Sequence, residues 1–385
     1  MNIKPCEICK GTRFQKLGTL CSNMKIMGPQ FSVGICEIVA CSDCGFVFNR
    51  YESAEQSSFD DYYLSTSKTM IYYEMYPELV ADSYFLHIFN NIQGYITQKS
   101  RILDVAGGYG ELAQLLVKKG FLDVTVLEWK PECVQAIRNA GIAAIEGNLL
   151  RLDIEQEKYD LIICSHTLEH FVDINTAMEK LREMVKPNGY VYLEVPDLYR
   201  YSELERAPYH FLTYEHVCHF SEVTLHNLSA RFGFQMMYLN KYVKCNDYPC
   251  LCAMLQPTSL NAELSRDAES TSCMLDYLRK CEETIAAVTK PLEESQVPLI
   301  LWGIGASTAQ LLNGNFDRCN VIQLVDSNPA RQGLSFQVGD RMLQIEDPSC
   351  VENREAIIFI LSTAYKISIE RSIRSYGYQN ETVAL

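Results

Sequence analysis

Residues 101–120 read RILDVAGGYGELAQLLVKKG, and this stretch decides the fold. The apolar run at 101–106 predicts a buried strand, and the apolar spacing at about 110–119 predicts a helix. The glycines between them permit a tight turn. Apolar runs at 123–129, 143–147, 159–165 and 190–195 follow, with helical patterns at 131–140 and 174–185 between some of them. Such alternation predicts βαβ units and a parallel sheet, and therefore an α/β fold.

The rest of the 385-residue chain predicts further units around this core. Ser221 is placed to cap a helix that ends before Gly233, and 234–243 with 249–255 predict a hairpin at the sheet edge. From Pro257 the chain turns polar, a helical pattern runs to about residue 290, and a second βα alternation starts after Pro298. We therefore expect domains at 1–95, 96–256 and 298–385, with a linker helix in 257–297.

Composition narrows the function classes. Hydrophobic residues make up 48% and charged residues 21%, which excludes wholesale disorder. The net charge of −14 makes the chain a poor nonspecific binder of nucleic acid or anionic membrane. No apolar run reaches about 18 residues, and the first residues lack a signal-peptide pattern. With 16 cysteines, we expect a reducing, cytoplasmic location; monomer and dimer both stay open.

Four cysteines near the start form two Cys-x-x-Cys pairs, Cys6 with Cys9 and Cys41 with Cys44. Each pair fits a turn that points two thiolates at one ion, and two such turns complete a tetrahedral site. The stretch between the pairs is longer than usual, so a small sheet is expected to fill it. The sequence predicts a structural zinc ion, with four unrelated thiols as the alternative.

The first glycine turn admits two interpretations. Gly108-x-Gly110-x-x-Ala113 is a loose dinucleotide fingerprint. Asp104-x-Ala106-x-Gly108-x-Gly110 instead resembles the first motif of class I methyltransferases, which use S-adenosylmethionine (SAM). The surroundings favour SAM, because Glu128 ends the second strand, Asn148 follows the third, and Leu168-Glu169-His170 resembles the LEH of these enzymes. We expect the cofactor at Asp104, Ala106, Gly107, Gly108, Gly110, Glu128, Trp129, Asn148, Leu149 and Ser165.

Four of the seven histidines lie between 210 and 226. Glu215, His216 and Phe220-Ser221 resemble the EHxxxFS segment of sugar-modifying methyltransferases. We expect His216 to act as general base with Glu215 in support, since a carboxylate beside an imidazole orients it and raises its basicity. A packing and capping role, or a metal site of His210, His216 and His219, are the alternatives. His170 and Tyr63 are further candidates near the acceptor.

A second glycine turn lies in LILWGIGASTAQLL, where Gly303 and Gly305 precede a helix N-terminus that could bind an anion. Asp326 ends the next strand, where a ribose-binding acid would stand. Alone, this pattern would fit an NAD site, but the following VDSNPARQG resembles the C-terminal domain of sugar C-methyltransferases.

The whole order resembles the three-domain C-methyltransferases of deoxysugar biosynthesis, which act on nucleotide-linked keto sugars. The resemblance implies a class I SAM methyltransferase Rossmann-like core, an N-terminal zinc-binding module and a C-terminal Rossmann-like α/β domain. It also implies a nucleotide sugar as partner, with substrate contacts at Gly303, Gly305, Ala306, Ser307 and Asp326.

Two positions depart from the family pattern. The family tyrosine of Tyr-His-Glu-His is replaced by Thr213, with Tyr214 next to it as the candidate for its role, and the lysine of the family's Ala-Lys-Gly-Asn-Thr is missing after the second glycine turn. The predicted reaction is methylation of carbon through an enolate, with oxyanion donation by His170 or Tyr63. The alternatives are O- or N-methylation of a sugar or glycan, a non-catalytic nucleotide-binding scaffold, and an NAD-dependent enzyme.

Overall fold

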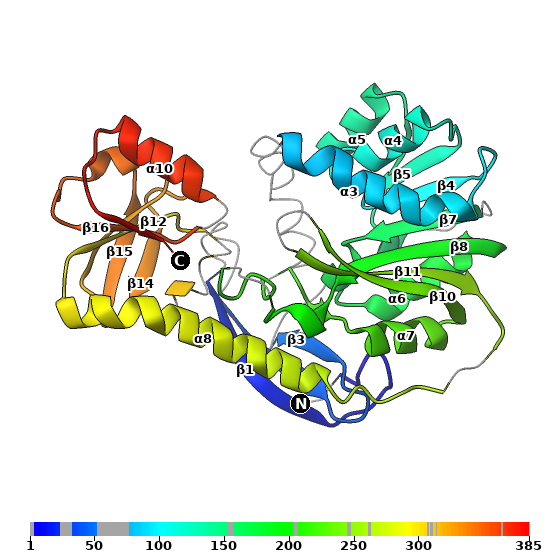
Figure 1. Ribbon diagram of the computed structural model, residues 1–385, viewed down its shortest axis with the longest axis horizontal. Coiled ribbons are helices and arrows are strands. Elements are labelled where there is room, and N and C mark those ends of the chain that lie inside the picture. Colours follow the sequence, from blue (N-terminus) through cyan, green and yellow to red (C-terminus); the bar gives the residue numbers. More distant parts are fainter. Residues whose placement is uncertain are drawn as a thin grey trace.

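The computed structural model contains three β-sheets connected by helices (Figure 1). It describes residues 4–23, 33–51, 77–152, 158–203, 207–213, 215–244, 248–260, 263–305, 308, 311–312, 314–362 and 365–384. Among these residues, no helix combines the length and apolar character needed to cross a membrane.

The central sheet confirms the α/β prediction. Its strand order is β10-β11-β8-β7-β4-β5-β6, and β11 runs antiparallel to β8. The strands are β4 (Ile102–Val105), β5 (Val124–Glu128), β6 (Ala143–Glu146), β7 (Tyr159–Ser165), β8 (Val185–Pro196), β10 (Phe234–Lys244) and β11 (Tyr248–Pro257). The last two form the expected edge hairpin.

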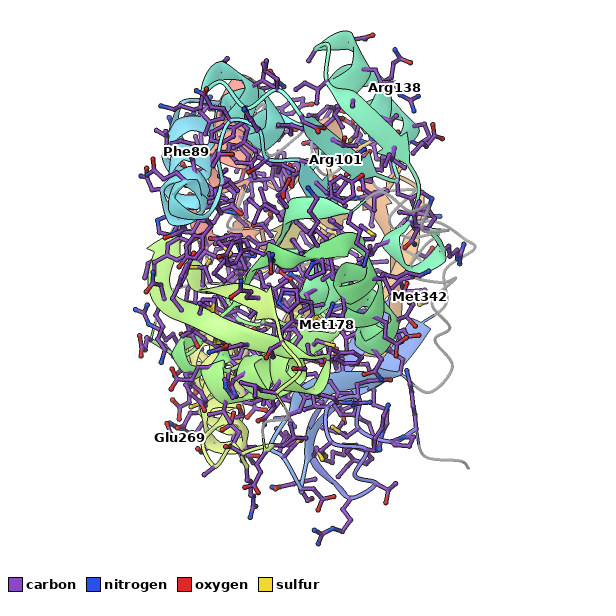
Figure 2. All side chains as sticks on the ribbon, turned by 90° about the vertical axis from the view of Figure 1, so that its right-hand side faces the viewer. Phe89, Arg101, Arg138, Met178, Glu269 and Met342 are labelled. Carbon is purple, nitrogen blue, oxygen red and sulfur yellow. The ribbon has the colours of Figure 1, made fainter. Side chains whose placement is uncertain are left out.

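Helices cover both faces of this sheet (Figure 1). On one face pack α3 (Pro77–Ile92), α4 (Glu111–Lys118) and α5 (Pro131–Asn139), and on the other α6 (Ile174–Met184) and α7 (Glu222–Arg231). Phe89 of α3 and Met178 of α6, labelled in Figure 2, lie on opposite sides of the sheet. Because β4 alternates side chains between the two faces, Ile102 joins one core and Leu103 the other.

The N-terminal sheet has the order β1-β2-β3-β9, built from β1 (Phe14–Asn23), β2 (Val33–Cys41), β3 (Val47–Tyr51) and β9 (Cys218–His219). Strand β9 belongs to the segment with the histidine cluster, and it pairs with β3 through Val47 opposite His219. The N-terminal sheet therefore fixes the backbone just after His216.

A long helix, α8 (Ser270–Ser295), runs from the N-terminal sheet to the C-terminal sheet (Figure 1). Its Met274 and Leu278 pack in one core with Ile38, whereas its Leu292 packs in the core of the C-terminal sheet. That sheet has the order β14-β15-β13-β12-β16-β17. Its strands are β12 (Leu299–Trp302), β13 (Val321–Val325), β14 (Ser335–Val338), β15 (Arg341–Glu346), β16 (Ile357–Ile360) and β17 (Thr382–Ala384). Helix α10 (Lys366–Ser375) lies between β16 and β17 in the chain and packs against β16. The division into domains stays a prediction.

Candidate active site

The turn between β4 and α4 needs its glycines for two different reasons. Gly108 and Gly110 have φ angles of 57° and 79°, in the left-handed region that side chains disfavour. At Gly107 a Cβ atom would lie 2.6 Å from Val126 Cγ1 and 2.7 Å from Asp104 Oδ2. The turn therefore exposes backbone N–H groups at the start of α4, where a ligand can approach the main chain closely.

Glu128 at the end of β5 is tied to this turn. Its Oε2 accepts a hydrogen bond from the Gly108 N–H at 3.0 Å, and its Oε1 accepts from the Trp129 N–H at 2.7 Å. Asn148, after β6, accepts from the Leu150 N–H at 2.9 Å and so caps the short 3₁₀ turn that begins at Leu149. These bonds hold the strand ends around one space.

That space is a cavity of about 440 Å³ at the carboxyl ends of the strands. Ligands bind at this edge in open α/β sheets. Of the residues expected to hold the cofactor, all but Gly110 line it, and His170 and Glu215 line it as well. Lining residues that we expected for the cofactor are Asp104, Ala106, Gly107, Gly108, Glu128, Trp129, Asn148, Leu149 and Ser165.

Asp104 tests whether SAM fits this cavity. Its side chain is buried, and its Oδ2 has no hydrogen-bond partner among the described residues. Burial, followed by the charges of Glu111 and Glu128, raises the pKa of Asp104 to about 8. Such a carboxyl group is costly without a partner, and a ligand ammonium group would restore its charged form. The methionine end of SAM carries an ammonium group, so the buried Asp104 carboxyl group fits this cofactor.

His170, which lines the cavity, packs against His216 to form a histidine pair. His170 Nδ1 is 2.9 Å from the Glu215 carbonyl oxygen, and His216 Nδ1 is 3.2 Å from the Phe211 carbonyl oxygen. Because a carbonyl only accepts, both rings carry the proton on Nδ1 and present Nε2 as the other nitrogen. The ring centroids are 4.9 Å apart in an edge-to-face arrangement.

His216 itself is 8% exposed and, unlike His170, does not line the cavity. Burial, and then the charge of His170, lowers the pKa of His216 to about 4. The ring is therefore neutral at pH 7, as a proton acceptor must be. The alternative prediction for this segment is a packing and capping role. Ser221 does cap α7, and Thr224 completes a capping box.

The metal alternative of His210, His216 and His219 is not assembled by the described residues. His219 is buried in β9, with Nε2 3.3 Å from Asn49 Oδ1 and Nδ1 3.4 Å from the Tyr201 hydroxyl. The ring of His210 packs 5.2 Å from that of Phe211. Tyr63 and Tyr214, expected near the acceptor, lie outside the described residues.

Sequence reasoning missed a buried ionic cluster beside the cavity. His166 Nε2 is 3.0 Å from Glu194 Oε1, and His166 Nδ1 is 3.3 Å from Glu169 Oε1. Burial alone would raise the pKa of both carboxyl groups. The hydrogen bonds from His166, together with nearby charges, outweigh burial, so the pKa of Glu169 is lowered and the pKa of Glu194 falls to about 2. The pKa of His166 is raised well above its usual range.

Two signals in the sequence could have found this cluster. Glu194 interrupts the apolar run YVYLEVP, where an acid in a buried strand needs a partner. His166 stands three residues before Glu169, a spacing that lets the two side chains meet at the turn leading into Leu168–His170. Tyr84 and Lys244 also line the cavity, with Lys244 Nζ 3.6 Å from the centroid of the Tyr84 ring.

The four N-terminal cysteines come together as their spacing predicts. Their Sγ atoms all lie within 4.8 Å of one another, with Cys6 to Cys44 at 3.6 Å and Cys9 to Cys41 at 3.4 Å. A tetrahedral zinc–thiolate site needs sulfur–sulfur distances of about 3.8 Å. The sulfurs therefore fit a zinc ion closely.

The backbone around the cysteines repeats the same turn twice. In each pair the N–H after the second cysteine donates to the carbonyl of the first, at 2.9 Å for Lys10 and 2.8 Å for Gly45. Both donors have positive φ, 63° and 83°. A Cβ at Gly45 would lie 2.2 Å from the Asp267 carbonyl oxygen, so glycine is required in the turn behind Cys44.

The second glycine turn follows β12, as predicted. Gly303 has a φ of 95°, and the Thr308 hydroxyl donates to its carbonyl oxygen at 2.9 Å. Asp326 is buried and accepts from Arg331 Nη1 at 3.1 Å, and the same guanidinium lies close to Gly305. Ala306 and Ser307 lie outside the described residues, and the substrate role of this turn stays a prediction.

A comparison with known protein families gives a match that covers most of the central sheet. Residues 81–239 match the family model described as "Methyltransferase domain". Residues 81–239 of the chain therefore match a methyltransferase domain, and they form most of the central α/β sheet. This match favours the SAM interpretation of the first glycine turn over the dinucleotide one.

Individual relatives are more distant. "Ubiquinone biosynthesis O-methyltransferase" of Pectobacterium carotovorum subsp. carotovorum (strain PC1) is 31% identical over 121 residues, covering 28% of this chain and 50% of that protein. The protein of the same name from Salmonella enteritidis PT4 (strain P125109) matches with the same identity and coverage. The chain thus spans about half the length of the curated relatives it matches.

Solved structures resemble the same part of the chain. A SAM-dependent methyltransferase from Methanosarcina mazei has a TM-score of 0.40 and 17% identity, covering 44% of this chain and 97% of its own. The 1,6-didemethyltoxoflavin-N1-methyltransferase of Burkholderia thailandensis has a TM-score of 0.42 and 15% identity, covering 57% and 97%. At these scores they add nothing to the family match.

Proposed function

We propose that this protein is a SAM-dependent methyltransferase whose acceptor is a nucleotide-linked keto sugar. One observation carries the first half of the proposal: a single cavity joins the glycine turn and Glu128 to the wall formed by His170 and Glu215. Such a cavity can hold donor and acceptor in line and exclude water between them.

The sugar acceptor is supported by the order of the sequence motifs. The order of the motifs resembles that of the sugar C-methyltransferases over nearly the whole chain: a four-cysteine module, a SAM core, a linker helix and a WGIGAS…VDSNPARQG segment. The second glycine turn would then contact the nucleotide. We also expect the protein in the cytoplasm, because four zinc-binding thiolates persist in a reducing compartment.

SAM supplies an electrophilic methyl group on a sulfonium. In this proposal His216, neutral and with Nε2 as its acceptor nitrogen, takes the proton from the carbon beside the acceptor carbonyl, and the C–H electron pair becomes the enolate. Because His216 packs against His170 and does not line the cavity itself, this step requires its ring to reach the cavity wall beside His170. Asp104, Gly108 and Glu128 would hold SAM, and the bound cofactor would supply its methyl group to the enolate carbon. His170 lines the cavity, but its Nδ1–H is taken by the Glu215 carbonyl oxygen, so it would donate to the developing oxyanion only as an imidazolium, through Nε2.

Methylation of oxygen is the second candidate. It is favoured by the curated relatives, which are named O-methyltransferases. The same histidine pair would then take a proton from a hydroxyl group. An NMR spectrum of the product separates the two, because a methyl group on carbon resonates far from one on oxygen.

The cysteine cluster would hold a structural zinc ion through Cys6, Cys9, Cys41 and Cys44. Four thiolates leave no open coordination position, so the ion would fix the fold of the N-terminal sheet. Since β3 of that sheet pairs with β9, the ion would also steady the segment that carries His216.

The proposal is tested by incubating the protein with SAM and a panel of nucleotide-linked keto sugars, followed by mass spectrometry. We expect one sugar to gain about 14 Da, one methylene in net composition. His216→Asn should lose roughly 10²–10⁴-fold in rate while still binding SAM, the usual contribution of a general base. Full activity in that variant would remove His216 from the mechanism, and no methylated sugar in any arm would contradict the acceptor class.

A further inference from the structure

We propose that Glu169, rather than Glu215, is the positioning residue of the histidine pair: its buried carboxylate orients His170 and His216 and balances the charge of the imidazole that accepts the acceptor's proton. This inference rests on the proposed function, because it assigns a role within the same site.

Glu169 has the contacts for this role. It is 1% exposed, and its Oε1 lies 3.3 Å from His166 Nδ1 and 3.9 Å from His170 Nε2. One of its oxygens, a nitrogen of His170 and a nitrogen of His216 all lie within 4.8 Å of one another. Its Oε2 has no hydrogen-bond partner in the described part of the chain, although it is buried.

A buried carboxylate oxygen without a partner destabilises the fold by roughly 1–3 kcal/mol or more. Proteins retain such a group where a charge arrives during function. Here the group that gains charge is the imidazole that takes up a proton. The new imidazolium would lie beside Glu169, as the imidazolium of a Ser-His-Asp triad lies beside its aspartate.

Glu215 fits this role less well. Its carbonyl oxygen, and not its carboxylate, receives the hydrogen bond from His170 Nδ1, and its side chain lines the cavity. The main chain of Glu169 is meanwhile locked to the same segment, because the Val217 N–H donates to the Glu169 carbonyl oxygen at 2.9 Å. Glu169 is thus held in fixed register with both histidines.

The charges of the cluster differ around its two carboxylates. Glu169 and Glu194 are two buried carboxylates, and His166 between them supplies one positive charge. Lys244 supplies a further positive charge that acts on Glu194, whereas the charges that act on Glu169 are those of His166, His170 and His216. An imidazolium at His170 or His216 would therefore add positive charge beside Glu169. The other titratable groups that face the cluster lie on neighbouring elements: Cys164 on β7, Tyr201 after β8, Glu215, Cys218 and His219 around β9, Lys244 on β10 and Cys250 on β11.

A divalent metal ion is the rival occupant of this place. An octahedral ion with ligands at 2.0–2.2 Å needs neighbouring ligand atoms about 3 Å apart. Glu169 Oε1 and His170 Nε2 are 3.9 Å apart, whereas the sulfurs of the cysteine cluster already stand close to their zinc distances. The geometry therefore favours an ion pair over a metal site.

The test uses Glu169→Gln, which removes the charge and nearly preserves the shape. Histidine signals are followed by NMR from pH 3 to 9 in the whole 385-residue chain without acceptor, and the pH profile of kcat/KM is measured with acceptor. We expect the titration midpoints of the cluster histidines and the acid limb of the profile to fall by about 1–2 pH units, because a carboxylate within 4–6 Å stabilises an imidazolium by about that much. The rate should fall by roughly 100-fold.

The controls separate this role from a structural one. Glu222→Gln removes a carboxylate that pairs with Lys241 on the surface of α7, and it should leave the midpoints unchanged. Glu169→Asp keeps the charge and should recover most of the midpoint and part of the rate. If Glu169→Gln does not fold, Glu169→Asp must still show a smaller downward shift.

Two results would overturn the inference: midpoints in the Glu169 variants equal to those of the wild type, or activity that chelators abolish and Mg²⁺ or Mn²⁺ restores. The NMR arm needs no acceptor. A shift in the midpoints without any methylated sugar would therefore leave the role of Glu169 standing and refute only the proposed acceptor.

Discussion

Replacing Glu128 by glutamine should weaken SAM binding without unfolding the protein. The Glu128 carboxylate accepts from the N–H groups of Trp129 and Lys130 on one oxygen and of Gly108 on the other. A glutamine amide can keep the oxygen on only one of these sides. The favourable choice keeps the two bonds to Trp129 and Lys130 and turns the NH₂ group toward the Gly108 N–H, which loses its acceptor.

The same change halves what the residue can offer a ribose. A carboxylate accepts from both ribose hydroxyls, and an amide accepts from one. Loss of one charge-assisted hydrogen bond, worth about 1.5–3 kcal/mol, together with a loosened Gly108 turn gives about 3 kcal/mol. At 1.4 kcal/mol per factor of ten, SAM should bind about 100-fold more weakly.

Isothermal titration of SAM into wild type and Glu128→Gln measures this change. Glu132→Gln is the matched control, since Glu132 lies on the exposed side of α5, and it should bind SAM as the wild type does. An affinity of Glu128→Gln within twofold of the wild type would refute the assignment of this carboxylate to the cofactor.

Three further predictions concern the turn, the metal and pH. Gly107→Ala should abolish SAM binding by titration and lower Tm, because its Cβ would meet Val126 at 2.6 Å and Asp104 at 2.7 Å; normal binding would show that the turn relaxes freely. Removing zinc with a chelator, or the substitution Cys44→Ser, should lower Tm. Either change should also slow methyl transfer, because β9 next to His216 pairs with the N-terminal sheet. Elemental analysis that finds less than one zinc ion per chain would contradict the site. His216 has a folded-state pKa of about 4, below the unfolded value near 6.5, so the unfolded state binds more protons and stability is lost as pH falls through that window. Between pH 7 and 5 this amounts to about 2 kcal/mol by urea unfolding, and His216→Gln should remove that part of the pH dependence.

The central sheet could be predicted because its signals are local. The apolar runs of five to seven residues became strands close to the expected bounds, except that β8 begins at Val185, five residues before its expected start; the glycine turn, Glu128 and Asn148 follow directly from strand ends. The carboxyl ends of parallel strands meet at one edge, so the cofactor residues gather without further information. The two cysteine turns are local in the same way.

The acceptor end could not be predicted as well, because its contacts join distant segments. Glu169 meets Val217 through the backbone, and Glu194 reaches His166 across neighbouring strands. The sequence favoured Glu215 because it stands beside His216, whereas Glu169 comes from a distant segment and has a carboxylate oxygen within 4.8 Å of a nitrogen of each histidine. Pairing of β3 with β9 has no local signal in a strand of two residues.

The most direct measurement is a crystal structure of the protein with S-adenosylhomocysteine, the demethylated cofactor. The ribose should lie against Glu128, the adenine near Asn148 and Leu149, and the sulfur should face Ser165 and His170 across the cavity. A complex in which this cavity stays closed to the ligand, or in which NAD binds there in its place, would contradict the assignment of the fold's central cavity to methyl transfer.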